Sequence, residues 1–598
     1  MDKLVSSRAL TCVIVCAASF RALGALPAVP VPPGNPITES KRVLGKILFW
    51  DEQLSSDNTT SCGTCHRAGA GGGDPLPARH PGADGAFNTP DDVFGSAGLI
   101  KANAADDFDR DVTFALNRQV TARSANPMIN AAYATDLFWD GRARTQFIDP
   151  QTGAVALFNN AALESQAVGP VVSSVEMAHA DRNWDQVIEK LRTAGPMALA
   201  TNLPSDVAQA VGSSGTYPSL FEAAFGDRQI TASRIAMAIA TYERTLISDQ
   251  APWDRFVAGD AGALTPGQQA GWNFFQASEC AICHVPPLFT DNLFRNIALR
   301  PNGEDIGRQA VTGLAGDRGK FKTASLRNLA TRPNLMHTGQ FTNVNQVFAF
   351  YAGPGAPGNP NRDPILPSAV PPPQINAITD FIVNGLTDPR VRLEQFPFDR
   401  PRLHTESAPL NPLLIAAGSA GTGGFVPRII ANCPPNAGNS GFKIGLDRAL
   451  AGATARLAIA TVPPVGGVVN PTTLSDPIVV AGVGTGNGFA TFHWPIPRDR
   501  TMDGQVYFMQ WRIADPAAPD GVALSNIAQV TLFGGSALPH CPGDADDNFV
   551  VNFSDVTVSL ANFGAAGVPF RAGDSNGDGV VDFADLTMTL ARWGNQCM

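Results

Sequence analysis

The amino-acid sequence predicts a multidomain protein with a mainly α-helical region, then a β-sandwich-like domain and a small α-helical module. Its 598 residues are too many for a single hydrophobic core. Apolar residues recur at helical spacing up to about residue 412, whereas short alternating runs separated by Gly, Pro and Asp follow residue 425. Two similar acidic loops, which begin at Asp544 and Asp574, lie near the end of the sequence. With 43 basic against 53 acidic residues, the composition gives no indication of nucleic-acid binding.

Residues 1–24 are expected to form a signal peptide. Lys3 and Arg8 precede an apolar run over residues 9–20, and Ala22 and Gly24 are small residues suited to a cleavage site. The run is too short to span a bilayer, and no later segment has the length of a membrane span. A lipid on Cys16 is the alternative interpretation. The sequence therefore predicts an exported protein that is periplasmic, displayed at the cell surface or secreted.

The motif Cys-x-x-Cys-His occurs twice, at residues 62–66 and 280–284. On one helical turn the two thiols lie on the same face, where they can reach both vinyl groups of one porphyrin, and the histidine supplies a nitrogen ligand to iron. A single four-cysteine zinc site is the alternative, but such sites keep their cysteine pairs about 15–20 residues apart, and these pairs are far more distant. We therefore predict two covalent c-type haems, attached through Cys62, Cys65, Cys280 and Cys283 and ligated by His66 and His284.

Further motifs follow one another in order between about residues 38 and 400: LGKILFWDEQLSSDNTTSCGTCH, FWDGRA, SQAVGPVVSSVEM, APWDRF, FKTASLRNLA and MHTG. Together they resemble the bacterial dihaem cytochrome c peroxidase family, which includes the MauG-type enzymes of methylamine utilisation. The resemblance implies a peroxidatic c-type haem domain over residues 25–260 and an electron-transfer haem domain over residues 261–412. It also implies that hydrogen peroxide is reduced to water at the first haem. Electrons would come from a small donor protein, a cytochrome c or a cupredoxin, through the second haem.

Glu176 and Gln166 stand where the family places the distal residues of its first haem. A carboxylate beside bound peroxide can move a proton from the inner to the outer oxygen, so that water becomes the leaving group. On spacing alone, an exposed helical glutamate and glutamine would be the simpler interpretation. The resemblance also implies that Trp139 lies between the haems as an electron relay, and the alternative, a buried core tryptophan, is compatible with this role because a relay must itself be packed. His80 is a candidate removable iron ligand, with a solvated loop histidine as the alternative.

The sixth ligand of the second haem separates two kinds of enzyme within the family. Tyr351 stands at the distance from His337 at which the peroxidases carry methionine and the MauG-type enzymes carry tyrosine. A phenolate stabilises the higher oxidation states of iron, whereas a thioether favours ferrous iron and raises the potential. Met336 is the competing ligand, and a core aromatic is the alternative role for Tyr351. His337 itself is interpreted as a structural residue.

Two segments depart from the family pattern. The peroxidases bind a calcium ion between the haem domains, partly through an asparagine that follows an arginine, and here Arg123 is followed by Ser124. Residues 331–334 also differ from the family, which puts an interdomain calcium ion in doubt. The acidic, Gly-rich insertion over residues 81–123 has no helical period and is expected to be a surface loop.

Residues 413–424 are rich in small residues and are interpreted as a linker. The β-sandwich-like domain is then expected over residues 425–535, with strands near residues 456–461, 489–494, 505–513 and 527–533. It contains no recognisable catalytic constellation, and spacing or adhesion is the expected role.

Residues 541–598 contain two loops whose oxygen-bearing residues fall at the positions of an EF-type calcium loop. The first loop supplies Asp544, Asp546, Asn548, Val550, Asn552 and Asp555, and the second supplies Asp574, Asn576, Asp578, Val580, Asp582 and Asp585. In the first loop Phe549 replaces the glycine of the sharp turn. The pair resembles a type I dockerin, which implies bound calcium and a cohesin-like partner. Cys541 and Cys597 bracket this module and are candidates for a disulfide, which leaves Cys433 as the odd thiol.

The interpretation that accounts for most of these features is an exported dihaem c-type peroxidase. One alternative is a MauG-like dihaem oxidase that modifies a partner protein. A different class of protein is also considered, a surface-tethered dihaem electron carrier. Glu176 and Gln166 argue against the carrier, because a carrier needs no acid or base beside its iron.

Overall fold

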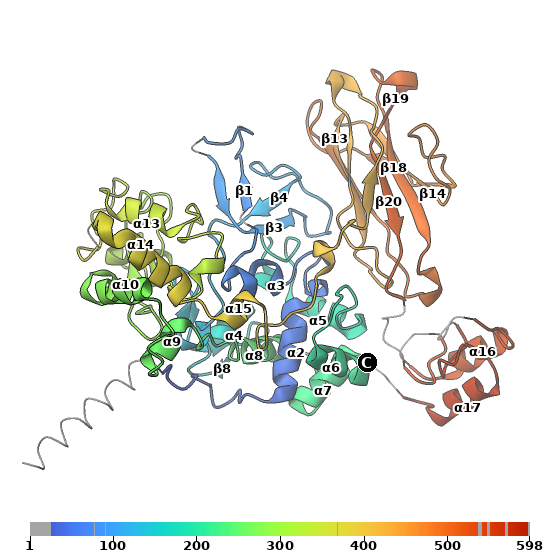
Figure 1. The fold of residues 1–598 in the computed structure, drawn as a ribbon. Helices are drawn as coiled ribbons and strands as arrows, with labels where there is room; N and C mark the ends of the chain where they lie inside the picture. Colours follow the sequence, from blue (N-terminus) through green and yellow to red (C-terminus); the bar gives the residue numbers. More distant parts are fainter. Residues whose placement is uncertain are drawn as a thin grey trace, which may run out of the picture.

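The computed structural model describes residues 25–76, 78–89, 91–366, 369–535, 541–546, 550–567 and 572–595. The predicted signal peptide lies outside these ranges, as do Asn548, Phe549 and Cys597. Figure 1 shows a mainly helical region, a sheet-rich domain that contacts it, and a small module with two helices. In the part of the chain that is described, no helix is both long and apolar enough to cross a bilayer.

The first hydrophobic core of the helical region is built around two helices, α2 (Glu39–Trp50) and α8 (Ala232–Glu243). Thr38 caps α2 by accepting a hydrogen bond from the backbone N–H of Lys41. The helices cross so closely that a Cβ atom at position 45 would collide with the carbonyl group of Ala238, so this position requires glycine. The other helices of this part are α3 (Cys62–Cys65), α4 (Ala162–Ala167), α5 (Trp184–Thr193), α6 (Ser205–Ser214) and α7 (Tyr217–Phe225), whereas α9 (Pro252–Val257) packs in the second core.

A second core surrounds the second Cys-x-x-Cys-His motif. Its aromatic residues interlock, and the ring centroids of Trp253 and Phe289 are 4.8 Å apart. Within the region predicted to be helical, this part contains α14 (Pro372–Asp380) with a π-helical continuation (Phe381–Gly385). The remaining helices are α10 (Pro266–Ala277), α11 (Cys280–Cys283), α12 (Gln309–Thr312), α13 (Val344–Tyr351) and α15 (Pro389–Arg392).

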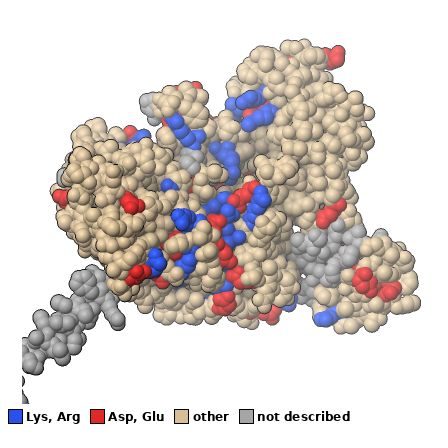
Figure 2. Space-filling model, viewed as in Figure 1, with Lys and Arg blue, Asp and Glu red and all other residues tan. Residues whose placement is uncertain are grey.

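From α15 onward the chain packs against the first core. Val391, Phe398 and Leu403 are fully or almost fully buried there, although they follow the second motif by more than a hundred residues. Arg400 binds both Glu394 and Glu406 on this returning segment. In Figure 2 basic and acidic side chains lie next to one another across the middle of the helical region. The charges visible on this face are therefore mixed rather than gathered into one large patch of a single sign.

Short strand pairs complete the helical region. They are β1 (Ala78–His80) with β2 (Val93–Gly95), β3 (Ala97–Ile100) with β4 (Arg118–Val120), β5 (Asp136–Leu137) with β6 (Ala143–Arg144), β7 (Phe147–Ile148) with β8 (Val155–Leu157), and β9 (Phe294–Arg295) with β10 (Phe321–Lys322).

The insertion over residues 81–123 contacts the sheet-rich domain. Phe108 and Leu116 are 3% and 1% exposed and form a small core with Ile430 of that domain. The Lys443 ammonium group lies 2.6 Å from a carboxylate oxygen of Asp106 and donates to it. The expectation of a surface loop is therefore wrong for this part of the insertion, because its apolar residues are covered by a domain distant in the sequence.

The sheet-rich domain consists of two antiparallel sheets that share one core, as predicted. Trp511 joins them, because its ring N–H donates to the carbonyl oxygen of Gly445 in the opposite sheet at 2.9 Å. Residues 413–415 of the predicted linker form an edge strand of the larger sheet. The larger sheet has the order β11-β20-β18-β14-β15 with β16 and β19 beside it, and the smaller has the order β12-β13-β17. The strands are β11 (Leu413–Ile415), β12 (Arg428–Ile430), β13 (Lys443–Ala449), β14 (Thr454–Ala460), β15 (Thr473–Leu474), β16 (Ile478–Val479), β17 (Gly488–His493), β18 (Val506–Ala514), β19 (Val522–Leu524) and β20 (Ile527–Thr531).

The last module has two similar halves, with helices α16 (Phe553–Ala561) and α17 (Phe583–Ala591). Each helix also bonds the loop of the other half. The Ser559 hydroxyl donates to the Gly573 carbonyl at 2.9 Å, and the Thr589 hydroxyl donates to the Gly543 carbonyl at 3.0 Å. This exchange shows that the internal repeat of the sequence is a structural repeat. Cys541 is disulfide-bonded.

Candidate functional site

Two cavities in the helical region each contain one Cys-x-x-Cys-His motif. The cavity beside Cys62, Cys65 and His66, here called the Cys62 cavity, has a volume of about 810 Å³. The cavity beside Cys280, Cys283 and His284, here called the Cys280 cavity, has a volume of about 200 Å³ and a mainly apolar lining. All four motif cysteines are free thiols. Both motifs therefore present reactive groups to a cavity rather than to each other.

The first motif forms the short helix α3, which Ser61 and Thr64 begin with reciprocal capping hydrogen bonds. Gly63 is required inside it, because a Cβ atom there would collide with the ring of Trp50. The ring Nδ1 of His66 lies 3.4 Å from the carbonyl oxygen of Gly72. A proton held on Nδ1 by this carbonyl leaves Nε2 free as a metal ligand.

The second motif repeats this arrangement on α11. The backbone N–H of His284 donates to the Cys280 carbonyl at 2.9 Å, which ends the helix at the histidine. Nδ1 of His284 lies 3.1 Å from the Phe289 carbonyl oxygen. Burial lowers the pKa of both histidines, which favours the neutral imidazole that binds metals. Two thiols and one oriented imidazole at each cavity therefore fit a covalently attached haem.

The predicted distal residues lie in the Cys62 cavity. Gln166 is near the end of α4, and Glu176 follows a short helical turn whose Ser173 carbonyl accepts a hydrogen bond from its backbone N–H. Strand β3 packs closely against this turn, since a Cβ atom at Gly98 would collide with the Val175 carbonyl. The structure thus brings an acid/base candidate and an amide to the cavity that contains the first motif.

Glu243, the last residue of α8, is a further carboxyl group of the Cys62 cavity that the sequence analysis missed. It is 5% exposed, and its Oε2 atom is buried without a hydrogen-bond partner among the described residues. Burial, opposed by Arg244 and reinforced by Glu164, raises the pKa of Glu243 to about 8. The group is therefore mainly protonated at pH 7 and can donate a hydrogen bond. The sequence does contain a signal for Glu243, which is a glutamate at a position that the apolar spacing of the helix assigns to its buried face.

Trp139 and His337 line both cavities and form part of the wall between them. The Trp139 ring N–H donates to the Ser124 carbonyl at 2.8 Å, which fixes the indole. The His337 ring stacks on Phe321 with centroids 3.7 Å apart and meets Trp139 edge-on at 6.2 Å. Burial lowers the pKa of His337 to about 3, so its ring is neutral. Trp139 and His337 are thus shared by the two cavities that contain the motifs.

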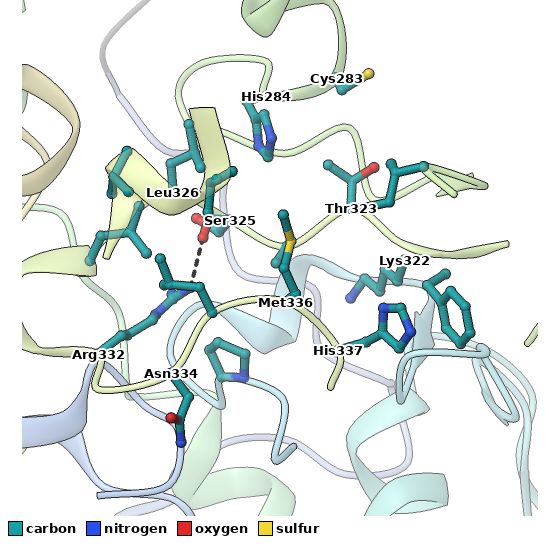
Figure 3. A pocket seen from close by; sticks show the side chains of 18 of the residues that line it. Cys283, His284, Lys322, Thr323, Ser325, Leu326, Arg332, Asn334, Met336 and His337 are labelled. Atoms are coloured by element: carbon teal, nitrogen blue, oxygen red, sulfur yellow. Dashed lines mark hydrogen bonds between the residues drawn. The ribbon is translucent and has the colours of Figure 1, made fainter. Parts of the chain in front are cut away.

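Tyr351 and Met336 both line the Cys280 cavity with His284. Tyr351 is the last residue of α13, and burial raises the pKa of its phenol. Figure 3 shows the Met336 side chain extending toward the His284 ring. The two candidate sixth ligands are therefore both within this cavity.

His80 lies apart from these groups. It is on strand β1, and its ring packs edge-on against Phe114 with centroids 5.0 Å apart. Among the described residues that line the Cys62 cavity, His80 is absent. The structure therefore does not bring His80 together with Glu176 and Gln166.

Ion pairs join the two parts of the helical region where an interdomain calcium ion was in doubt. Arg123 binds both carboxylate oxygens of Asp305 at 2.8 Å and one oxygen of Asp140 at 2.7 Å. Ser124, which follows it, contributes backbone groups: its N–H donates to the His337 carbonyl at 2.8 Å. An arginine thus crosslinks the two parts at this place.

Comparison with known proteins gives the family. The family model described as di-haem cytochrome c peroxidase matches residues 39–262. The chain is 32% identical over 328 residues to the methylamine utilization protein MauG of Methylorubrum extorquens, covering 54% of this chain and 72% of that protein. It is 29% identical to the cytochrome c551 peroxidase of Pseudomonas aeruginosa, over 53% of this chain and 72% of that protein.

Two solved structures align with more than half of this chain at low sequence identity. A MauG-like protein associated with microbial copper homeostasis covers 64% of this chain and is itself covered to 97%, at 22% identity and a TM-score of 0.44. The diheme peroxidase BthA from Burkholderia thailandensis covers 62% of this chain at 19% identity and a TM-score of 0.39.

The family match and the curated relatives make this chain an oxidoreductase of the di-haem peroxidase class. The chain belongs to the di-haem cytochrome c peroxidase family, which includes MauG. The resemblance stated from the sequence is confirmed.

Proposed function

We propose that this protein is an exported peroxidase that reduces hydrogen peroxide to water with electrons that enter through a second haem. In this proposal Cys62, Cys65 and His66 hold the first haem, and the second motif holds the other. One observation carries the proposal: Glu176 and Gln166 line the same cavity as His66. The signal-peptide pattern of residues 1–24 supports export.

The haems supply redox-active iron when bound, and the chain supplies proton transfer, orientation and a route between the cavities. The Glu176 carboxylate accepts a proton from the inner oxygen of hydrogen peroxide and returns it to the outer oxygen. The Gln166 amide orients the peroxide by hydrogen bonding. Trp139, fixed by Ser124, lies on the path along which electrons pass from the Cys280 cavity to the Cys62 cavity. A small cytochrome c or a cupredoxin is the proposed electron donor.

The test is peroxide consumption by the purified full-length protein with a reduced small cytochrome c or cupredoxin as donor. A peroxidase consumes one peroxide for each two electrons delivered. An electron carrier would instead show two low-spin, six-coordinate ferric haems and no reaction with peroxide. That spectrum would overturn the proposal.

Tyr351 favours a second candidate function, a MauG-like oxidase that modifies a partner protein, because this phenol lines the Cys280 cavity with His284. If Tyr351 is the sixth ligand, Tyr351→Phe should change the second haem's spectrum and raise its midpoint potential, since an anionic phenolate stabilises ferric iron. Spectroelectrochemistry of both proteins measures this shift.

Met336→Leu is the matched variant, because Met336 lines the same cavity and offers the competing sulfur. It should leave the spectrum of the second haem unchanged if Tyr351 is the ligand. A wild-type protein with the weak far-red charge-transfer band of methionine-ligated ferric haem would contradict tyrosine ligation and favour the ordinary peroxidase.

We also propose that residues 541–598 bind calcium and attach the enzyme to a cohesin-like partner. Oxygen atoms of Asp544, Asp546 and Asp555 lie within 4.8 Å of one another. Two oxygens that bind one calcium ion at about 2.4 Å lie at most about 5 Å apart, so this spacing fits. Asp574 and Asp585 of the second loop are also almost completely buried, which a bound cation would compensate. Asn548, proposed for the first loop, lies outside the described residues.

Removal of calcium should therefore unfold this module alone. With a chelator added to the full-length protein, amide hydrogen exchange in α16 and α17 should lose most of its protection, and the haem spectra should stay nearly unchanged. Added calcium should restore the protection, and added magnesium should do so less well. Protection that ignores the chelator would contradict calcium binding.

A further inference from the structure

Arg332 lines the Cys280 cavity, and among the described residues its guanidinium group bonds only to main-chain carbonyl oxygens. Its nitrogens donate to Gly71 at 3.3 Å, to Ser325 at 3.0 Å and to Arg327 at 2.8 Å. Figure 3 shows Arg332 beside Ser325 on the wall of this cavity. Among the described residues, no carboxylate forms an ion pair with Arg332.

Arg244 and Arg327, two almost fully buried arginines of the helical region, are paired with acids, whereas the buried Arg182 bonds main-chain carbonyls and lines neither cavity. Arg244 binds both carboxylate oxygens of Glu164, and Arg327 binds both of Asp254. By contrast, burial alone acts on the Arg332 guanidinium and lowers its pKa to about 10. The Arg332 side chain is half-buried, and a cation withdrawn from water without a counter-ion is costly. The cavity that Arg332 faces is therefore the place where an anion is expected.

Lys322 gives the same indication from another side of the cavity. It lines the wall near Met336 and His337, and its ammonium group has no ion pair among the described residues. Two carboxylates, Asp74 and Glu279, also line the cavity, but neither is bound to Arg332 or Lys322. A haem carries two propionate groups, so two unpaired cations match the charge of the group that the second motif would hold.

The Nε atom of the Arg332 guanidinium group contacts the loop that follows the first motif. Gly71 accepts the bond from Arg332, and the next carbonyl, that of Gly72, faces Nδ1 of His66. Gly71 has a φ of +64°, and a Cβ atom there would crowd the Arg332 side chain. The arginine thus packs directly against the loop that orients the imidazole of the other cavity.

We propose that Arg332 is a positioning residue that binds a propionate of the haem in the Cys280 cavity and, through Gly71, fixes the loop that orients His66. This inference rests on the proposed attachment of one haem at each motif. One side chain would then bind a propionate of the second haem and hold the loop that orients His66, the histidine ligand of the first haem.

The test is Arg332→Gln in the full-length protein, which removes the charge but keeps a hydrogen-bonding side chain. The midpoint potential of the second haem should shift downward, because a nearby cation favours ferrous iron over ferric iron. The iron–histidine stretching band of the first haem, measured by resonance Raman in the ferrous protein, should shift or broaden as the loop loses its anchor. Arg332→Lys should restore the potential but not this band, because an ammonium group lacks the planar fork that binds several carbonyls and a carboxylate together.

Arg144→Met is the matched control. Arg144 is exposed and also donates to a carbonyl of the second part, that of Val311 at 3.4 Å, but it lines neither cavity. The Arg144→Met substitution should change neither the midpoint potential of the second haem nor the iron–histidine band of the first haem. An unchanged potential of the second haem in Arg332→Gln, or an equal shift in Arg144→Met, would overturn the inference. Wild-type protein without two covalent haems would instead contradict the proposed function, so the two failures are distinguishable.

Discussion

Replacement of Glu176 by Gln should slow the reaction with peroxide by about 10²–10⁴-fold, which is the usual contribution of general acid/base catalysis. The amide keeps the size of the side chain but cannot accept the proton of the inner peroxide oxygen. Rapid-mixing spectroscopy of the fully loaded protein measures the rate at several peroxide concentrations. The concentration at half-saturation should change much less than the limiting rate, because the substitution removes proton transfer and little binding.

Glu189→Gln is the matched control for this experiment. Glu189 is on α5, its side chain is 69% exposed, and it does not line either cavity. It should react at the wild-type rate. Equal rates for Glu176→Gln and the wild type would show that Glu176 is not the acid/base of this reaction.

Simultaneous replacement of Cys62 and Cys65 by Ala should remove one of two covalent haems and abolish the reaction with peroxide. Each c-type haem is held by two thioether bonds, so denatured wild-type protein should keep both haems and this variant only one. Replacement of Cys280 and Cys283 should remove the other haem and stop electron delivery. Haem content per chain after denaturation, with mass spectrometry of the denatured chain, measures both effects.

Cys433→Ala provides the control, because Cys433 is a free and fully buried thiol in the two-sheet domain, away from both motifs. It should retain two haems and full reactivity. Extraction of both haems from the wild type by acid and organic solvent would show that the attachment is not covalent.

Local patterns predicted much of this architecture. Helical spacing of apolar residues before residue 412 predicted helices such as α2, and alternation near residues 505–513 predicted β18, because each pattern is set by neighbours close in sequence. The two Cys-x-x-Cys-His motifs also predicted two haem sites, because each motif is a pattern of residues that are close in sequence. Glu176, Gln166 and Trp139 could be placed only through the resemblance to a family, since a lone glutamate or tryptophan has no periodic signature.

Contacts between distant segments could not be predicted in this way. Val391, Phe398 and Leu403 complete a core whose other fully buried members end at Leu246, and nothing in their spacing says which core they enter. Arg332 stands in a segment that differed from the family, but its unpaired charge is visible only when the surrounding carbonyls and cavity are known. Glu243 follows the apolar pattern of α8, and only burial reveals its unusual protonation.

The contact between the insertion and the two-sheet domain bears on how this protein can be divided into fragments. Phe108 and Leu116 are covered by Ile430, and Asp447 of β13, which also pairs with Arg428 of the neighbouring strand β12, binds Arg110 across the same boundary. A fragment that ends before residue 413 would expose both apolar side chains and leave Arg110 without its partner. Such a newly exposed surface promotes self-association. The part that carries both motifs is therefore best produced together with the two-sheet domain. If that domain is removed, the insertion should also be shortened between residues 101 and 117, so that its apolar side chains are not exposed.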